Sequence, residues 1–171
     1  VEIALKNSNA KDILRKIVDE FGEKILIGAG TILTKEDLID VVKIGVKFVL
    51  SPIMFSQEQI QICIKNDVIC VPGAFTPSEI YKSFKDGADI VKVFPANTVT
   101  PKYFKSIKAP LGELKLMAVG GVNAKNALEF FANGADFLGI GSGIFKSEDV
   151  INGNYENVKK SVESFEAVLY K

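Results

Sequence analysis

The sequence predicts an α/β fold, a parallel (β/α)8 barrel of the TIM type. Short apolar runs recur at intervals of about 20 residues, and each is followed by a turn and an amphipathic helical stretch. The runs are continuously apolar rather than alternating, which is typical of parallel strands buried on both faces. The residues that could carry chemistry gather at the carboxyl ends of the runs, where barrels build their sites. This last point favours a barrel over a doubly wound open sheet.

Seven strands are expected along the chain. They span 1–5, 25–29, 48–51, 68–72, 90–94, 116–119 and 137–140. Such a barrel closes with eight strands, and the sequence starts inside a strand. Residues 1–171 are therefore interpreted as a single barrel domain from which the first strand–helix unit is missing.

Helical patterns fill the intervals between the strands. They lie at 10–21, 35–44, 57–66, 77–86, 103–108 and 124–133, and a last helix is expected at about 156–170. Thr34 and Thr76 stand where helix N-caps are expected, each followed by acidic residues in the first turn. Gly45, Gly87 and Gly134 follow helices at positions where a left-handed C-cap is favoured.

Composition narrows the function. The 171 residues carry 21 basic and 21 acidic side chains, so no charge excess favours nucleic acid or an anionic membrane as a partner. No apolar run approaches the roughly 20 residues that span a bilayer, and no secretory signal is visible. Cys63 and Cys70 are not spaced as C-x-x-C and are expected to be reduced core thiols of a cytoplasmic protein. Histidine is absent, so a metal is not expected, and acid–base chemistry must use carboxylates, lysine, tyrosine or water.

Lys92 is the first candidate for chemistry. It lies in the middle of the apolar run Ile90-Val91-Lys92-Val93-Phe94. Burial disfavours an ammonium group, so we expect a lowered pKa and a neutral, nucleophilic amine. The alternative is a structural lysine that extends from the strand end into solvent.

Glu2 is a second charged residue in an apolar strand, and alternation places it on one face with Ala4 and Lys6. A carboxylate at this position is expected to be desolvated, which would suit it to general acid–base catalysis. The alternatives are an ion pair with Lys6 or a position at the edge of the sheet.

Small residues follow two further strands. Gly28-Ala29-Gly30-Thr31 could let a ligand approach the backbone, with the Thr31 hydroxyl binding a carboxylate. It could equally be a tight turn in which Thr31 caps the next helix. Ser51-Pro52 is a weaker signal of the same kind.

Glycines also close the last two strands, as Gly120-Gly121 and as Gly139-Ile140-Gly141-Ser142-Gly143. The loops after the last two strands of a barrel commonly bind phosphate through backbone N–H groups. The two loops together therefore predict a phosphate site.

In this order, the motifs resemble those of the bacterial 2-keto-3-deoxy-6-phosphogluconate aldolase family over essentially the whole chain. That family includes 4-hydroxy-2-oxoglutarate aldolases and 2-keto-3-deoxy-6-phosphogalactonate aldolases. The motifs are V-E-I at 1–3, G-A-G-T at 28–31, S-P at 51–52, V-P-G at 71–73, K-V-F-P-A at 92–96, G-G at 120–121 and G-I-G-S at 139–142. The K-x-F-P-A motif is the most specific of them.

The resemblance implies a class I aldolase that cleaves a 2-keto-3-deoxy-6-phospho sugar acid to pyruvate and glyceraldehyde 3-phosphate, or 4-hydroxy-2-oxoglutarate to pyruvate and glyoxylate. It implies Lys92 as the Schiff-base lysine and Glu2 as the general acid–base, with no metal or other cofactor. It also implies a homotrimer. The substrate-binding residues that it implies are Lys6, Thr31, Pro52, Phe94, Gly120, Gly121, Gly141 and Ser142.

Departures from the family pattern bear on substrate choice. Lys6 stands where some members have an arginine, so the charge is kept but the planar fork is lost. Ala118 and Val119 occupy the positions of a proline and a threonine often found before the glycine pair, and A-V-G-G-V is more similar to the phosphogalactonate members. Ile53 stands where many members have glycine. The reaction class is predicted, while the preferred sugar epimer stays open.

Two other functions fit part of the pattern. Another phosphate-binding barrel enzyme, such as a sugar-phosphate epimerase or isomerase, would share the glycine loops without needing Lys92 as a nucleophile. A non-catalytic barrel or barrel fragment would keep the fold without a complete site.

Overall fold

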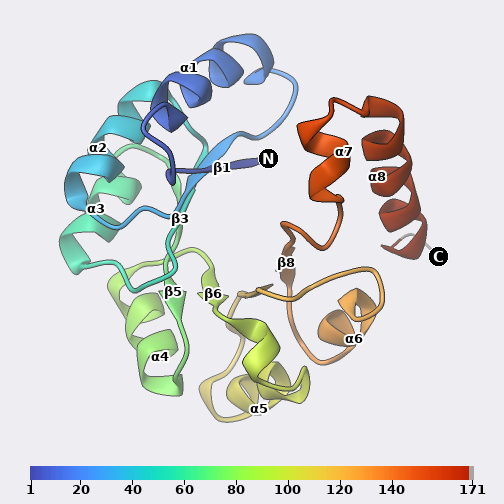
Figure 1. Ribbon diagram of the computed structural model, residues 1–171. Helices are drawn as coiled ribbons and strands as arrows, with labels where there is room; N and C mark the ends of the chain where they lie inside the picture. Colours follow the sequence, from blue (N-terminus) through green and yellow to red (C-terminus); the bar gives the residue numbers. More distant parts are fainter. Residues whose placement is uncertain (170–171) are drawn as a thin grey trace. The chain divides into compact units, whose positions relative to one another are not determined.

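The computed structural model describes residues 1–169, and strands and helices alternate along them (Figure 1). The chain divides into two compact units, one formed by Val1–Lys92 and the other by the residues from Val93 onward. Strands pair in parallel within each unit, so the predicted α/β class with parallel strands is confirmed.

The first unit contains a four-stranded parallel sheet in the order β1-β2-β3-β4. Strands that follow one another in sequence are neighbours in the sheet, and a helix makes each crossover between them. The elements are β1 (Glu2–Ala4), α1 (Ala10–Phe21), β2 (Gly28–Gly30), α2 (Lys35–Ile44), β3 (Phe48–Leu50), α3 (Gln57–Lys65), β4 (Ile69–Val71), β5 (Gly73–Ala74), α4 (Pro77–Asp86) and β6 (Val91–Val93), the last of which crosses the unit boundary.

The second unit is built on β7 (Leu116–Val119) and β8 (Phe137–Gly139), which pair in parallel. Its other elements are the 3-10 turn η1 (Ala96–Thr98) and the helices α5 (Lys102–Leu111), α6 (Ala127–Ala132), α7 (Ser147–Ile151) and α8 (Tyr155–Leu169). Helix α8 packs against α6 and α7 and buries Phe165.

The core of the first unit forms because each helix turns one apolar stripe toward the sheet. Leu14 of α1, Leu38 of α2 and Ile60 of α3 are completely buried there. Burying an apolar side chain of this size stabilises the fold by about 1.5–3 kcal/mol. Cys63 and Cys70 lie in the same core as free thiols, as predicted.

The helix-end signals in the sequence are confirmed. The Thr34 hydroxyl accepts a hydrogen bond from a first-turn N–H of α2 at 3.1 Å, and Thr76 forms a capping box at the start of α4. The three glycines that follow helices adopt left-handed backbone angles: Gly45, Gly87 and Gly134 have φ values of 97°, 109° and 96°.

Two aspartates, each following a Gly-Ala pair, fix the amino ends of buried strands. The Asp89 carboxylate accepts the backbone N–H of Cys70 in β4 at 2.8 Å. The Asp136 carboxylate accepts the backbone N–H of Leu116 in β7 at 2.7 Å and also pairs with Lys108 at 2.7 Å. Each carboxylate thus provides an acceptor for a backbone N–H of a strand that would otherwise have none.

Several element boundaries differ from the prediction. The strand expected at 25–29 lies at Gly28–Gly30, because Ile25 and Leu26 are exposed and precede it. The helix expected at 124–133 begins only at Ala127, after a turn in which Asn126 accepts a hydrogen bond from the N–H of Asn123. Elements β5, η1 and α7 have two to five residues and give too weak a periodic signal to be predicted. The predicted end of the last helix, at residue 170, lies outside the described residues.

Removing the Asp136 carboxylate should destabilise the protein. Asp136→Ala leaves the buried N–H of Leu116 without an acceptor, so urea denaturation should show a loss of about 2 kcal/mol in the free energy of unfolding. Asp12→Ala is the matched control, because Asp12 forms an exposed ion pair with Arg15 and no other among residues 1–169, and it should change stability by less than about 0.5 kcal/mol. Equal losses in the two variants would contradict the assigned role.

Candidate active site

Lys92 is buried in the middle of a strand. It is the central residue of β6, between the fully buried Val91 and Val93, and only 7% of its surface is exposed. Its backbone N–H donates to the carbonyl oxygen of Pro72 at 2.9 Å, just beyond the end of β4. The side chain is therefore enclosed by protein, and the alternative of a lysine extending into solvent is wrong.

Burial changes the chemistry of this amine. Desolvation is the largest influence on Lys92 and lowers its pKa below the ordinary 10.5. The negative charge of Glu2 acts in the opposite direction, whereas the positive charge of Lys6 lowers the pKa further. Because the net effect is a lowered pKa, the neutral amine that can attack a carbonyl carbon is more abundant than on a surface lysine.

Glu2 extends from β1 across the backbone of Gly30 in the neighbouring strand. A Cβ atom on Gly30 would overlap the Glu2 carboxylate, so the missing side chain at Gly30 provides the space that the carboxylate occupies. The expected desolvation of Glu2 is wrong, because β1 is the edge strand of its sheet and Glu2 is exposed. Its charge nevertheless acts on Lys92. A role as general acid–base stays a prediction.

Lys6 lies beyond β1 rather than on the strand face of Glu2. The strand ends at Ala4, and the backbone N–H of Lys6 donates to the Ala4 carbonyl oxygen at 2.8 Å, which turns the chain. The Lys6 side chain is exposed, yet its charge still acts on Lys92. The turn therefore keeps a cation at the edge of the site.

Thr31 has a strained backbone. Its φ of 59° lies in the left-handed region, which is unfavourable for a β-branched residue and costs of order 1–3 kcal/mol. The residue that caps α2 is Thr34, so the alternative in which Thr31 serves as the helix cap is wrong. A strained, half-buried threonine next to Gly30 fits the ligand-binding interpretation, which stays a prediction.

Pro52 follows β3 in a tightly packed turn. The buried Ser51 hydroxyl accepts the N–H of Ile53 at 3.1 Å, and the N–H of Gly73 donates to the Ile53 carbonyl oxygen at 3.0 Å. A Cβ atom on Gly73 would come within 2.5 Å of the Pro52 backbone. The two strand-end turns are thus closely packed, and Pro52 stays half-buried in a fixed position.

In the second unit, the loop after β7 offers backbone donors. Gly120 and Gly121 both have left-handed angles, with φ of 102° and 72°. The side-chain amides of Asn123 and Asn126 each donate to the Gly121 carbonyl oxygen at 3.0 Å. Within residues 1–169 the N–H of Gly121 has no acceptor, so the anchored loop leaves it for a ligand.

The loop after β8 is similar. Gly141 and Ser142 are exposed, and a Cβ atom on Gly141 would have no neighbour within 4 Å. The N–H groups of Ser142 and Gly143 have no acceptor in the described part of the chain. The geometry of this loop fits an anion bound by backbone donors, as the sequence indicates.

Phe94, which directly follows β6, is half-buried.

The first unit contains most of the residues predicted for the carbonyl chemistry. These are Lys92, Glu2, Lys6, Thr31 and Pro52, of which Glu2 and Lys6 act electrostatically on Lys92, whereas the glycine loops belong to the second unit. Sequence reasoning missed the two asparagines that anchor the Gly121 loop. The available signal was N-A-K-N directly after G-G-V, since asparagine side chains often bond to nearby backbone in turns.

Residues 1–169 contain no cluster of three or more histidine, cysteine, aspartate or glutamate side chains able to hold a metal ion. The same part of the chain has no helix long and apolar enough to cross a membrane.

Comparison with known proteins defines the class. The family model for KDPG and KHG aldolase matches residues 1–161. The 2-dehydro-3-deoxy-6-phosphogalactonate aldolase of Escherichia coli K12 is 30% identical over 166 residues, which are 96% of this chain and 80% of the relative. The KHG/KDPG aldolase of the same organism is 26% identical over 161 residues, 94% of this chain and 75% of the relative.

Solved structures point to the same class of protein as the family model and the relatives. A native KDPGal structure superposes with a TM-score of 0.87 at 27% identity, covering 100% of this chain and 83% of its own. A KDPG aldolase from Legionella pneumophila, with pyruvate captured at low pH as a covalent carbinolamine, gives a TM-score of 0.84 at 29% identity, covering 94% of this chain and 77% of its own.

The protein is an aldolase and so a carbon–carbon lyase. It belongs to the KDPG and KHG aldolase family. The predicted resemblance and enzyme class are confirmed, and neither the epimerase alternative nor the non-catalytic alternative is supported.

Relieving the strain at Thr31 should stabilise the protein and weaken ligand binding. Thr31→Gly accepts the left-handed angle without a clash, so the free energy of unfolding should rise by up to about 1 kcal/mol. Binding of pyruvate, the ligand captured in the Legionella structure, should weaken at least severalfold because the hydroxyl is gone. Thr31→Ser keeps the hydroxyl and should bind pyruvate as before. Lower stability with unchanged pyruvate affinity in Thr31→Gly would show that the conformation is only structural.

Proposed function

We propose that this chain cleaves 2-keto-3-deoxy-6-phospho sugar acids to pyruvate and glyceraldehyde 3-phosphate through a Schiff base on Lys92. The observation that carries the proposal is the enclosed Lys92 amine with its lowered pKa, under the influence of Glu2 and Lys6. The carbinolamine captured in the Legionella relative supports covalent chemistry of this kind. The reaction uses no metal and no cofactor beyond the lysine.

The reaction starts when the neutral Lys92 amine attacks the C2 carbonyl carbon of the substrate. Loss of water gives a protonated imine, which accepts the electron pair released when the C3–C4 bond breaks. Glu2, acting through a water molecule, takes the C4 hydroxyl proton and later protonates the enamine carbon. Hydrolysis of the imine then frees pyruvate and restores the amine.

The remaining residues bind the two ends of the substrate. Lys6 provides a cation for the pyruvate carboxylate and Thr31 provides a hydroxyl, while Pro52 and Phe94 provide apolar contacts to the substrate. The phosphate is held at the other end by backbone N–H groups of the two glycine loops, Gly120-Gly121 and Gly141-Ser142.

A substrate of the phosphogalactonate type is favoured. The relatives named as phosphogalactonate aldolases from Escherichia coli and Rhizobium meliloti are 30% and 31% identical, against 26% for the KHG/KDPG aldolase. The pair Ala118-Val119 before the glycines also departs from the proline and threonine of many phosphogluconate members. Steady-state kinetics with phosphogalactonate, phosphogluconate and 4-hydroxy-2-oxoglutarate substrates would decide the preference.

We further propose, from the resemblance to the aldolase family, that the parallel strands belong to a closed (β/α)8 barrel and that the assembly is a homotrimer. The two free, buried thiols fit a cytoplasmic location.

Borohydride trapping tests the central step. Pyruvate plus borohydride should label the protein once per chain, on the peptide that contains Lys92. Lys92→Arg keeps the positive charge but cannot form the imine, so it should lose the label and all turnover while its circular dichroism is unchanged. A label on Lys6, or substantial activity in Lys92→Arg, would contradict the proposal.

Glu2→Gln is the matched variant for the proton transfers. It should still trap pyruvate, more slowly, and lose about 10²–10⁴-fold in turnover. Gly30→Ala should show the same pattern, because its added methyl group displaces the Glu2 carboxylate without altering its charge. Wild-type turnover in both variants would exclude Glu2 from the reaction.

A further inference from the structure

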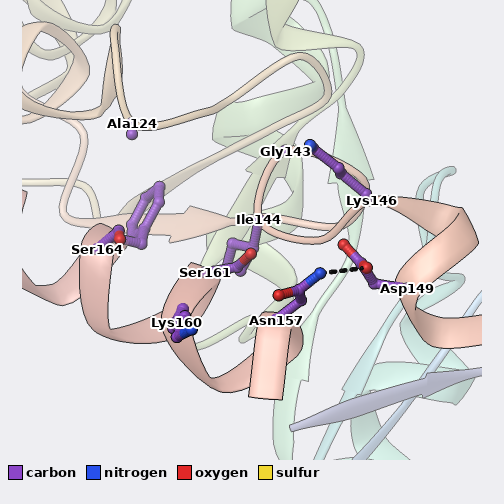
Figure 2. Close-up of a pocket in the computed structure, with 10 residues that line it drawn as sticks. Ala124, Gly143, Ile144, Lys146, Asp149, Asn157, Lys160, Ser161 and Ser164 are labelled. Carbon is purple, nitrogen blue, oxygen red and sulfur yellow. Dashed lines mark hydrogen bonds between the residues drawn. The ribbon is translucent and has the colours of Figure 1, made fainter. Parts of the chain in front are cut away.

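A cavity of about 410 Å³ lies in the second unit, between the loop that carries Gly143 and Ile144 and one face of helix α8 (Figure 2). Its volume falls in the range of small-molecule sites, about 300–1,000 Å³. Apart from the backbone N–H of Gly143 in the loop after β8, the proposed reaction uses none of its lining residues. The lining includes Gly143, which directly follows Ser142 of the phosphate loop.

Two lysines make the lining of this cavity basic. Lys146 precedes α7 and Lys160 lies on α8, and both line the cavity. Within residues 1–169 neither of them forms an ion pair, whereas the adjacent Lys159 lies 3.9 Å from Glu163. Two uncompensated ammonium groups at one cavity favour an anion as the ligand.

Asp149 is the carboxylate in the lining, and its Oδ1 atom accepts hydrogen bonds from two side-chain amides. It accepts a hydrogen bond from the Asn157 side-chain amide at 2.8 Å (Figure 2). It accepts another from the Asn154 side-chain amide at 3.2 Å. Neutral amides stabilise this charge without cancelling the lysines, so two positive charges and one negative charge leave the lining at +1. Asp149 also holds Asn157 in place at the cavity.

The rest of the lining combines hydroxyl groups with an apolar wall. Ser161 and Ser164 lie three residues apart on α8, on the same side of the helix as Lys160. Ile144 and the almost fully buried Phe165 provide apolar surface. A ligand that fits both features carries a charged oxygen group on a small apolar body.

We propose that this cavity is a second anion site, which binds a small organic phosphate monoester. Lys146 and Lys160 would bind the phosphate oxygens together with the hydroxyls of Ser161 and Ser164, and the organic part would lie on Ile144 and Phe165. Binding here does not depend on the proposed reaction. An effect on catalysis does, because Gly143 and Ile144 of the cavity wall directly follow Gly141-Ser142 of the phosphate loop, and a bound ligand would contact that loop.

Calorimetric titration with phenyl phosphate tests the site on the full-length protein. We expect two sites per chain in the wild type, one at the glycine loops and one in the cavity. Lys160→Glu should lose the second site or weaken it at least about tenfold, and Lys146→Glu should do the same. Lys159→Glu changes the net charge equally at the neighbouring position and should keep both sites. Lys160→Met is the fallback if charge reversal impairs folding.

Pyruvate trapping on Lys92 should stay at the wild-type level in each variant, which separates this test from that of the proposed function. If the glycine loops bind no phosphate, the wild type should show one site, and Lys160→Glu must still remove it. Phenyl phosphate binding that is unchanged in both Lys146→Glu and Lys160→Glu would overturn the proposal. A loss as large in Lys159→Glu would overturn it too, by showing only a general charge effect.

Discussion

The burial of one amine, that of Lys92, is the constraint on which the rest of the site depends. The position of Lys92 at the centre of β6 lowers its pKa and makes the amine a nucleophile. The same burial lowers the stability of the fold, because a protonated lysine is more favourable in the unfolded chain than in the folded one. The folded pKa lies below the unfolded value of about 10.5, so the unfolded state binds more protons in the pH window between them. The destabilisation caused by the burial of Lys92 therefore decreases as the pH rises through that window. The surrounding strands must supply the stability that this residue removes.

The surroundings of the Lys92 amine depend on the missing side chain of Gly30 as much as on the charged residues nearby. Gly30 has no side chain, and the Glu2 carboxylate occupies that space, which keeps a negative charge close enough to oppose the effect of burial. Lys6 is placed by a turn after β1 and acts in the other direction. In the second unit, Gly121 is fixed through its carbonyl oxygen while its N–H stays available. In each unit a glycine is thus paired with polar side chains: Gly30 with Glu2, and Gly121 with Asn123 and Asn126.

The sequence predicted what depends on local pattern. A lysine between two valines in an apolar run can be recognised as buried, and Thr34 can be recognised as a helix cap from the residues that follow it. For Glu2 the sequence left open whether the carboxylate is desolvated or lies at the edge of the sheet, and the structure agrees with the edge alternative, which depends on strand order rather than on neighbours in sequence. The left-handed angle of Thr31 could not be predicted, because a β-branched residue rarely adopts it. The basic cavity beside α8 brings Lys146 together with Lys160 through helix packing, which no spacing rule indicates.

The pKa of Lys92 in the resting enzyme is the most direct test of this account. It can be measured by following the side-chain Cε and Nζ resonances of isotopically labelled lysine against pH, with the Lys92 signal assigned by its loss in Lys92→Arg. The account predicts a pKa below the ordinary 10.5, shifted upward in Lys6→Met and downward in Glu2→Gln. A wild-type pKa at or above 10.5, or shifts of the opposite sign in the two variants, would contradict it.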